Sequence, residues 1–172
     1  MEKSHPTLGC CGLDCGLCPR FHTAGTSRCP GCGGPGFAQK HPACGFHSCC
    51  FKNKGLEACA LCAEYPCPRF DREDGSRDSF VTHRRVRDNQ QAIREDGLEA
   101  FLLRQRGRMA FLEAALARHG DGRSKGLYCL AAALLSAGGL DGALRAADGG
   151  ADLKALLAAL AAAEGEALKL RK

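Results

Sequence analysis

The chain has 172 residues, 13 cysteines and a formal net charge of +5. Its longest uninterrupted apolar runs, 127–135 and 155–163, are far shorter than the ~18 residues that a membrane-spanning helix needs. The opening Met-Glu-Lys-Ser-His-Pro-Thr lacks the apolar stretch of a secretory signal, so we expect a soluble, cytoplasmic protein without a membrane partner.

Twelve of the 13 cysteines fall between Cys10 and Cys67. A reducing cytoplasm keeps thiols free, so this density indicates metal binding rather than disulfides. The large apolar residues of the segment are too few to offset backbone entropy of about 1–2 kcal/mol per residue, and metal has to supply the difference. We therefore predict two units: a small metal-stapled, cysteine-rich domain at 8–70, zinc-knuckle or ribbon-like with little regular structure, and an all-α helical bundle at 71–172.

The first ten residues show no pattern, and we expect them to be frayed. Two C-x2-C pairs follow, Cys15/Cys18 and Cys29/Cys32, separated by ten residues. Two such pairs can close a tetrahedral four-sulfur shell with Zn–S distances of about 2.3 Å. These four thiols predict a first zinc site.

A second group holds six thiols, more than a four-ligand site needs: Cys44, Cys49, Cys50, Cys59, Cys62 and Cys67. It contains another C-x2-C pair, Cys59/Cys62, and ends in Cys67-Pro68. We expect Cys50 to join Cys59, Cys62 and Cys67 in a second zinc site, and the surplus leaves the assignment open.

Three motifs carry a resemblance: Cys-Gly-Leu-Asp-Cys-x-x-Cys-Pro from Cys11, Cys-x-Gly-Cys at 29–32, and the stretch 50–67. Together they resemble the cysteine-rich bacterial and archaeal family catalogued as domain of unknown function 3795. The resemblance implies no established activity. It identifies as motif positions Cys11, Cys15, Cys18, Cys29, Cys32, Cys50, Cys59, Cys62 and Cys67. Cys10 and Cys49 are additions beside motif cysteines, and a cross-braced arrangement with Cys11 in place of an assigned thiol is the alternative partition.

His41 and His47 are possible nitrogen ligands, but with thiols in excess we expect solvated loop histidines. The pattern at 53–63 predicts a short helix that Tyr65-Pro66 stops.

The second half is predicted to be helical throughout. A helix capped by Asp78 or Ser79 should run to about Arg94 and expose a solvated stripe of Arg84, Arg87, Gln91 and Arg94. The periodicity of leucine and phenylalanine predicts a helix over 98–119. Further helices should begin at Ser124 and end at Gly138-Gly139, span 140–147, and run from an Asp152 cap through Leu160 towards Leu168.

Standard enzyme motifs are missing from the sequence, and no catalytic residue is assigned. A surplus of thiols favours closed four-sulfur sites, so we interpret the chain as a zinc-binding structural or adaptor-like protein. Because Cys-Pro pairs and excess cysteines also suit [4Fe–4S] clusters, the first alternative is an iron–sulfur protein in electron transfer or redox sensing. The second is a thiol oxidoreductase with a free C-x-x-C pair.

Residues 123–129 carry one further hypothesis. The helix start at Ser124, with Arg123 and Lys125 beside it, could bind an anion and modestly activate Cys129 on the same helical face. The alternative is an ordinary helix cap with a buried cysteine.

The charge distribution argues against a nucleic-acid partner. Each four-thiolate site would carry −2, so two sites bring the net charge to about +1. Lysine and arginine only slightly exceed the acids in each part of the chain, so no basic arm is present. We expect a protein partner instead.

Overall fold

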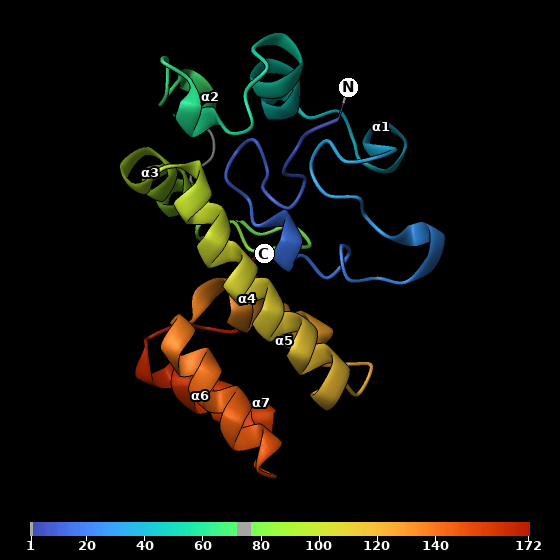
Figure 1. The fold of residues 1–172 in the computed structure, drawn as a ribbon, viewed down its shortest axis with the longest axis vertical. Helices are drawn as coiled ribbons and strands as arrows, with labels where there is room; N and C mark the ends of the chain where they lie inside the picture. Colours follow the sequence, from blue (N-terminus) through green and yellow to red (C-terminus); the bar gives the residue numbers. More distant parts are fainter. Residues whose placement is uncertain (1, 72–76) are drawn as a thin grey trace.

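The computed structural model describes residues 2–71 and 77–172. Cysteine-rich loops form one end of the molecule, and α6 and α7 form the other, with the long α4 between them (Figure 1). Within the described ranges there is no β-strand, and one isolated antiparallel bridge pairs Leu8 with Asp14. None of the helices in these ranges has the length and apolar character needed to cross a membrane.

The first half contains only short helical turns joined by loops. They are η1 (Cys15–Leu17), η2 (Gly25–Ser27), α1 (Phe37–Lys40), η3 (His47–Asn53), η4 (Cys59–Leu61) and α2 (Pro68–Asp71). The N-terminal segment lies inside these loops, because the Cys32 N–H donates to the carbonyl of Pro6 (2.8 Å) and the Lys3 N–H to that of Gly33 (2.9 Å). Leu8 is fully buried. The expectation of a frayed start was wrong, since this segment supplies one hydrogen-bond acceptor and one donor to the loop that carries Cys32.

The second half consists of longer helices, as the sequence predicts. They are α3 (Val86–Asp96), α4 (Leu98–His119), α5 (Lys125–Leu134), α6 (Ala137–Asp148) and α7 (Leu153–Ala163). The bounds of α4 match the prediction, and Gly97, with a φ of +89°, separates it from α3. Asp152 caps α7 as predicted, because its carboxylate accepts the N–H of Lys154 at 2.9 Å.

Several predicted helix bounds were wrong for identifiable reasons. The helix expected at 53–63 is absent, because Gly55 adopts a φ of +67° that ends η3. Gly138 and Gly139 lie in the first turn of α6, where the Ser136 hydroxyl accepts the Gly139 N–H. The last helix stops at Ala163 and does not reach Leu168.

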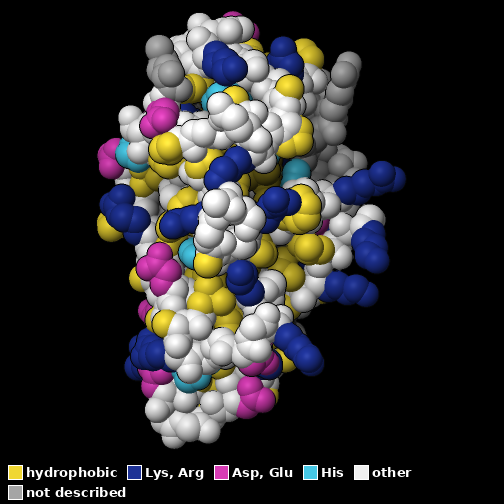
Figure 2. All heavy atoms as spheres, turned by 90° about the vertical axis from the view of Figure 1, so that its right-hand side faces the viewer, with side chains coloured by type: hydrophobic (Ala, Val, Ile, Leu, Met, Phe, Trp, Pro, Cys, Tyr) yellow, Lys and Arg dark blue, Asp and Glu magenta, His cyan; other side chains and the backbone are white. Residues whose placement is uncertain are grey.

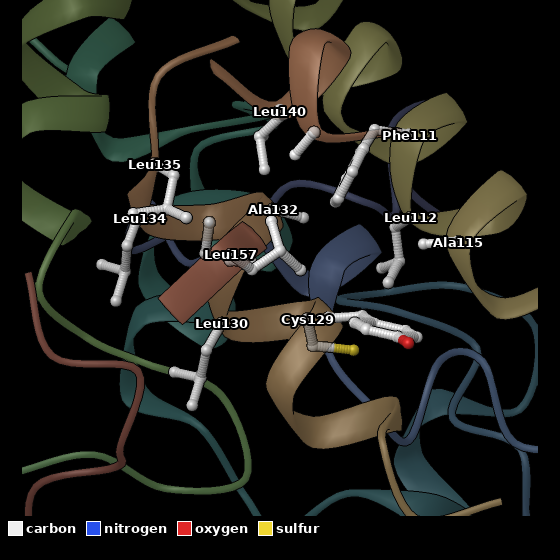
Figure 3. Packing of buried hydrophobic residues seen from close by; sticks show 14 of the residues in the cluster. Phe111, Leu112, Ala115, Cys129, Leu130, Ala132, Leu134, Leu135, Leu140 and Leu157 are labelled. Carbon is white, nitrogen blue, oxygen red and sulfur yellow. The ribbon is translucent and has the colours of Figure 1, made fainter. Parts of the chain in front are cut away.

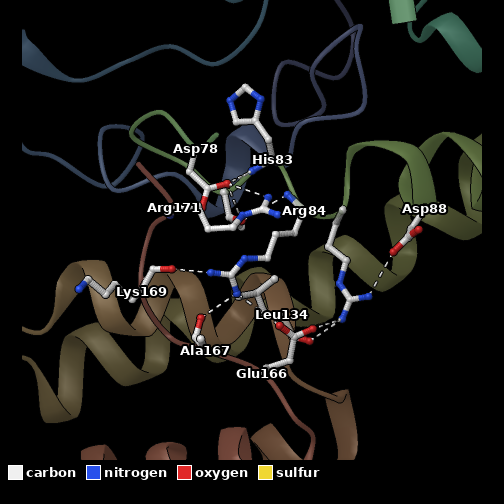
Figure 4. A network of polar contacts seen from close by, with 11 residues as sticks. Asp78, His83, Arg84, Asp88, Leu134, Glu166, Ala167, Lys169 and Arg171 are labelled. Atoms are coloured by element: carbon white, nitrogen blue, oxygen red, sulfur yellow. Dashed lines mark hydrogen bonds and ion pairs between the residues drawn. The ribbon is translucent and has the colours of Figure 1, made fainter. Parts of the chain in front are cut away.

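The helix predicted from Asp78 begins only at Val86. Asp78 instead anchors the C-terminal tail: its carboxylate accepts the backbone N–H groups of His83 and Arg171, both at 2.8 Å (Figure 4). Arg84 continues this attachment by donating to Glu166 and to the carbonyls of Ala167 and Lys169.

The predicted solvated stripe is confirmed at Arg87, Gln91 and Arg94, which are exposed, whereas Arg84 is partly buried against the tail. Besides Arg84, Arg87 donates to the carbonyl of Phe70 at 2.6 Å, and Arg94 lies over the Tyr65 ring. These side chains hold loops and the tail against α3, because a guanidinium can donate to several carbonyls at once.

The main core joins the helices to the cysteine-rich half. It holds Phe111 and Leu112 of α4, the buried face of α5, Leu140 of α6 and Leu157 of α7 (Figure 3). Leu17 of η1 belongs to the same cluster. A second shared cluster packs Leu8, Ala58 and Ala60 against Ile93, Phe101 and Leu102. The predicted boundary near residue 70 stays a prediction, and the two halves pack directly on each other.

Candidate metal centre

The cysteines of the first half surround two cavities. The larger has a volume of about 430 Å³ and is lined by six of the predicted ligands: Cys11, Cys15, Cys18, Cys29, Cys32 and Cys44. The smaller, of about 30 Å³, is lined by Cys49, Cys50, Cys59, Cys62 and Cys67. The four thiols expected to form each site therefore lie around the same cavity, joined by Cys11 and Cys44 at the larger and by Cys49 at the smaller.

Two of the C-x2-C pairs fold in the same way. Each wraps a single 3₁₀ turn, η1 or η4, and closes it with a backbone hydrogen bond: Cys18 N–H to Cys15 C=O at 3.2 Å, and Cys62 N–H to Cys59 C=O at 2.9 Å. The sequences Cys-Gly-Leu-Cys and Cys-Ala-Leu-Cys thus place two thiols on one side of a tight turn. This local geometry is what a knuckle requires.

The third pair depends on glycine. Gly31 has a φ of +82°, and a Cβ there would lie 2.2 Å from the carbonyl oxygen of Pro6. Only glycine therefore lets Cys29 and Cys32 turn back towards the N-terminal segment.

At Cys18, burial raises the thiol pKa, and hydrogen bonds to its sulfur from the N–H groups of Arg20 and Phe21 oppose the rise. Such N–H groups favour a thiolate.

Cys10, which the sequence marked as an addition, lies between the two groups. Its side chain is only 1% exposed, its sulfur is 3.9 Å from that of Cys32, and it lies in one buried cluster with Cys32, Cys50 and Cys59. The bond with Cys32 lowers the pKa of Cys10, but the contact with Cys50 and burial raise it to about 12 overall. Cys10 lines neither cavity, yet it connects a thiol of the larger to a thiol of the smaller.

The cysteine-rich half also buries two side chains that can carry a positive charge, Lys3 and His47. Lys3 has a fully buried side chain, donates to the Leu8 carbonyl at 2.6 Å and lies 3.8 Å from Glu57. His47 is 7% exposed, and its Nε2 atom has no hydrogen-bond partner among the described residues. The expectation of a solvated loop histidine fits His41, which is exposed, but was wrong for His47 because Phe37 and Phe51 pack against its ring.

The thiols do not converge on single points. Across the part of the chain that the structure describes, no group of three or more Cys, His, Asp or Glu side chains has the arrangement of a mononuclear metal site. All 13 cysteines lie in that part, and all carry free thiols. The geometry is one of thiols spaced around the walls of cavities.

The N–H groups of the anion site predicted at 123–129 already bind a carboxylate of the chain itself. Asp121 accepts the N–H groups of Arg123 at 2.9 Å and Ser124 at 2.8 Å and pairs with Lys154 of α7. Ser124 precedes α5 without donating or accepting a side-chain capping bond there. Cys129 is buried in the helical core, and burial raises the pKa of its thiol to about 12, the reverse of activation (Figure 3). Lys125 begins α5, and the arrangement corresponds to the alternative of a helix start with a buried cysteine.

Comparisons of the chain with protein-family models, with curated proteins and with solved structures found no match. The resemblance of residues 11–70 to the family of unknown function 3795 therefore stays a prediction.

Proposed function

We propose that this chain is a metal–thiolate protein with two centres, one at each cysteine-lined cavity. The supporting observation is the division of eleven cysteines between the two cavities, which keeps the two predicted sets of four thiols apart. Cys44, which the sequence grouped with the second set, lines the larger cavity instead. Thiolates are the preferred ligands of zinc and of iron–sulfur clusters, so the donor set fits either group.

The size of the larger cavity favours an iron–sulfur cluster. Four thiolates around one zinc ion at 2.3 Å stand roughly 3.8 Å apart, which leaves no cavity between them. A cluster spreads its thiolate ligands over several iron atoms, so it needs thiols around a larger volume. Six thiols around about 430 Å³ meet that need, and electron transfer or redox sensing is the function that follows.

The size of the smaller cavity favours a single zinc ion. Its volume of about 30 Å³ suits one ion, and Cys50, Cys59, Cys62 and Cys67 line it and would have to draw closer together to complete a four-sulfur shell. This centre would be structural and would hold the loops that follow η3. Because Cys59 and Cys62 share their cavity with further thiols, metal binding is favoured over a two-thiol oxidoreductase site.

A second candidate keeps zinc at both centres, with the structural or adaptor role that the sequence predicts. The 3.9 Å separation of the Cys10 and Cys32 sulfurs favours it, since that is close to the spacing of thiolates around one zinc ion. In that arrangement Cys10 would be a ligand.

Anaerobic purification with an absorbance spectrum and elemental analysis separates the candidates. We expect a brown protein absorbing near ~400 nm, with about four iron ions and about one zinc ion per chain. Colourless protein with about two zinc ions would replace the cluster by the second candidate, and protein without metal would overturn both.

Serine variants then test the ligands. Cys15→Ser should abolish the iron absorbance and leave the zinc, because Cys15 lines only the larger cavity. Cys129→Ser is the matched control, a buried cysteine outside both cavities that should leave both metals in place. Equal loss of both metals from Cys15→Ser would contradict two separate centres.

A further inference from the structure

The larger cavity has a cationic mouth. Besides its thiols it is lined by Arg20, Lys40, His41 and His83, and its described lining residues include no aspartate or glutamate. On the face drawn in Figure 2, hydrophobic side chains gather between lysine and arginine side chains.

The two permanent cations at the mouth keep their charge uncompensated. The Arg20 guanidinium lies 4.7 Å from the centre of the Phe80 ring, and Lys40 donates to the carbonyls of Thr26 (2.9 Å) and Arg28 (3.1 Å). These partners are neutral, and the ion pairs found among the described residues involve neither cation. Both side chains are exposed and can take an anionic partner.

The remaining large side chains of the lining are apolar. Phe37, Phe46, Phe80 and Val81 line the cavity, and the Phe80 side chain is 62% exposed. Small-molecule sites are mostly apolar with a few placed polar groups, and the part of the roughly 430 Å³ cavity that the metal centre would leave free has that lining. This combination suits a ligand with an apolar body and one charged end.

We propose that the mouth of the larger cavity binds a small organic anion, a carboxylate or phosphate on an apolar body, with the charged end at Arg20 and Lys40. The inference rests on the proposed metal centre, because metal fixes the thiols that form the floor. A four-thiolate centre carries −2, so the apolar body faces the floor and the anionic end remains at the mouth. Guanidinium and ammonium groups form charge-assisted hydrogen bonds with either kind of anion.

Calorimetric titration of the metal-loaded chain at fixed ionic strength tests the inference with three probes. Phenyl phosphate has both the apolar body and the charge, benzyl alcohol lacks the charge, and inorganic phosphate lacks the body. We expect phenyl phosphate to bind about tenfold more tightly than either of the others. Equal affinities for phenyl phosphate and inorganic phosphate would reduce the mouth to a non-specific charged surface and overturn the proposal.

A pair of arginine variants locates the site. Arg20→Gln should weaken phenyl phosphate binding about tenfold. Arg28→Gln is the matched control, because Arg28 also stacks on a phenylalanine (5.0 Å from the Phe21 ring centre) but does not line the cavity. An equal loss in both variants would contradict a site at the mouth.

Metal analysis of each sample keeps the two proposals apart. A normal metal content without preference for phenyl phosphate overturns the anion site and leaves the metal centre standing. Wild-type protein that lacks metal overturns the metal centre. If metal-free wild-type protein also shows no preference for phenyl phosphate, the anion site is overturned as well. If it keeps the preference, the mouth of the cavity forms without metal.

Discussion

The two halves of this molecule bury different kinds of side chain. The helical half buries hydrocarbon side chains such as Leu112, Leu135 and Leu157, all fully buried, and hydrophobic burial at about 25 cal/mol per Å² stabilises it directly. The cysteine-rich half buries thiols, among them Cys10, Cys32, Cys50 and Cys59. Thiols stabilise a fold strongly only when they hold a metal, so the same degree of burial gives different stability in the two halves.

The largest expected effect comes from removing metal. A structural zinc site contributes an apparent ~10–16 kcal/mol at neutral pH, which the loops around the cavities cannot replace by apolar contacts. A strong chelator should abolish the dispersed amide signals of residues 8–70 in NMR spectra, while α6 and α7 keep their hydrogen-exchange protection. Helical circular dichroism should largely remain.

The hydrophobic clusters that contain residues of both halves make this expectation more specific. Because Leu17 lies in the helical core, the part of α5 that η1 contacts should lose some protection on chelation, whereas α7 should not. Unchanged amide signals throughout the chain would contradict the dependence of the first half on metal.

The next effect comes from the helical core. Leu112→Ala should lower the free energy of unfolding by about 2–5 kcal/mol, because it removes a fully buried side chain and leaves a cavity. Leu103→Ala on the same helix is the control, since Leu103 is 64% exposed and should change stability by less than about 0.5 kcal/mol. Thermal unfolding of the metal-loaded chain measures both, and similar losses would refute the packing described for α4.

A smaller effect is expected where the halves are joined by polar groups. Gln105 of α4 is 2% exposed, and its Nε2 donates to Asp14 at 2.8 Å and to the Thr7 carbonyl at 3.1 Å. Gln105→Leu takes one of two donors from each acceptor, since Asn89 still donates to Asp14 and the Gly16 N–H to the Thr7 carbonyl, and it removes the acceptor of the Thr7 hydroxyl. The loss of these hydrogen bonds at a buried junction should cost about 1–3 kcal/mol. Gln91→Leu, at an exposed position of α3, is the control and should be nearly neutral in denaturant unfolding. A larger loss of unfolding free energy in Gln91→Leu than in Gln105→Leu would show that the junction does not depend on Gln105.

The smallest effect concerns the C-terminal tail. Desolvation raises the pKa of Asp78, but the N–H groups of Arg171 and His83 lower it more, from 3.8 to about 2. A folded-state pKa below the unfolded value stabilises the fold above about pH 4, and this contribution is lost as the pH falls towards 2. Solvent near the tail reduces the effect, so we expect about 1 kcal/mol.

Asp78→Asn should remove that acid sensitivity. The difference in unfolding free energy between wild type and variant, measured from pH 6 to pH 2, should shrink as the pH falls. A difference independent of pH would show that Asp78 does not hold the tail through its charge.

The sequence by itself determined the features that depend only on residues close together along the chain. The helix at 98–119 follows from its leucine and phenylalanine periodicity, which only Gln105 interrupts on the buried face, and from glycines at both ends. The Asp152 cap and the Cys15/Cys18 turn are also local, because each hydrogen bond joins residues two or three positions apart. The Cys59/Cys62 turn is equally local, although the sequence predicted a helix over 53–63 there. The grouping of the cysteines into an early and a late set is visible in their spacing except at Cys44, which the spacing assigns to the late set and the fold places at the larger cavity.

The tertiary structure decided what depends on distant partners. Cys10 connects the two thiol groups only because the N-terminal segment lies among the loops, and Gln105 reaches Thr7 across 98 positions of sequence. Arg84 holds the tail more than 80 residues away. A residue's type states which hydrogen bonds it can make, but which distant groups it meets depends on how the whole chain packs, and local spacing does not encode that packing.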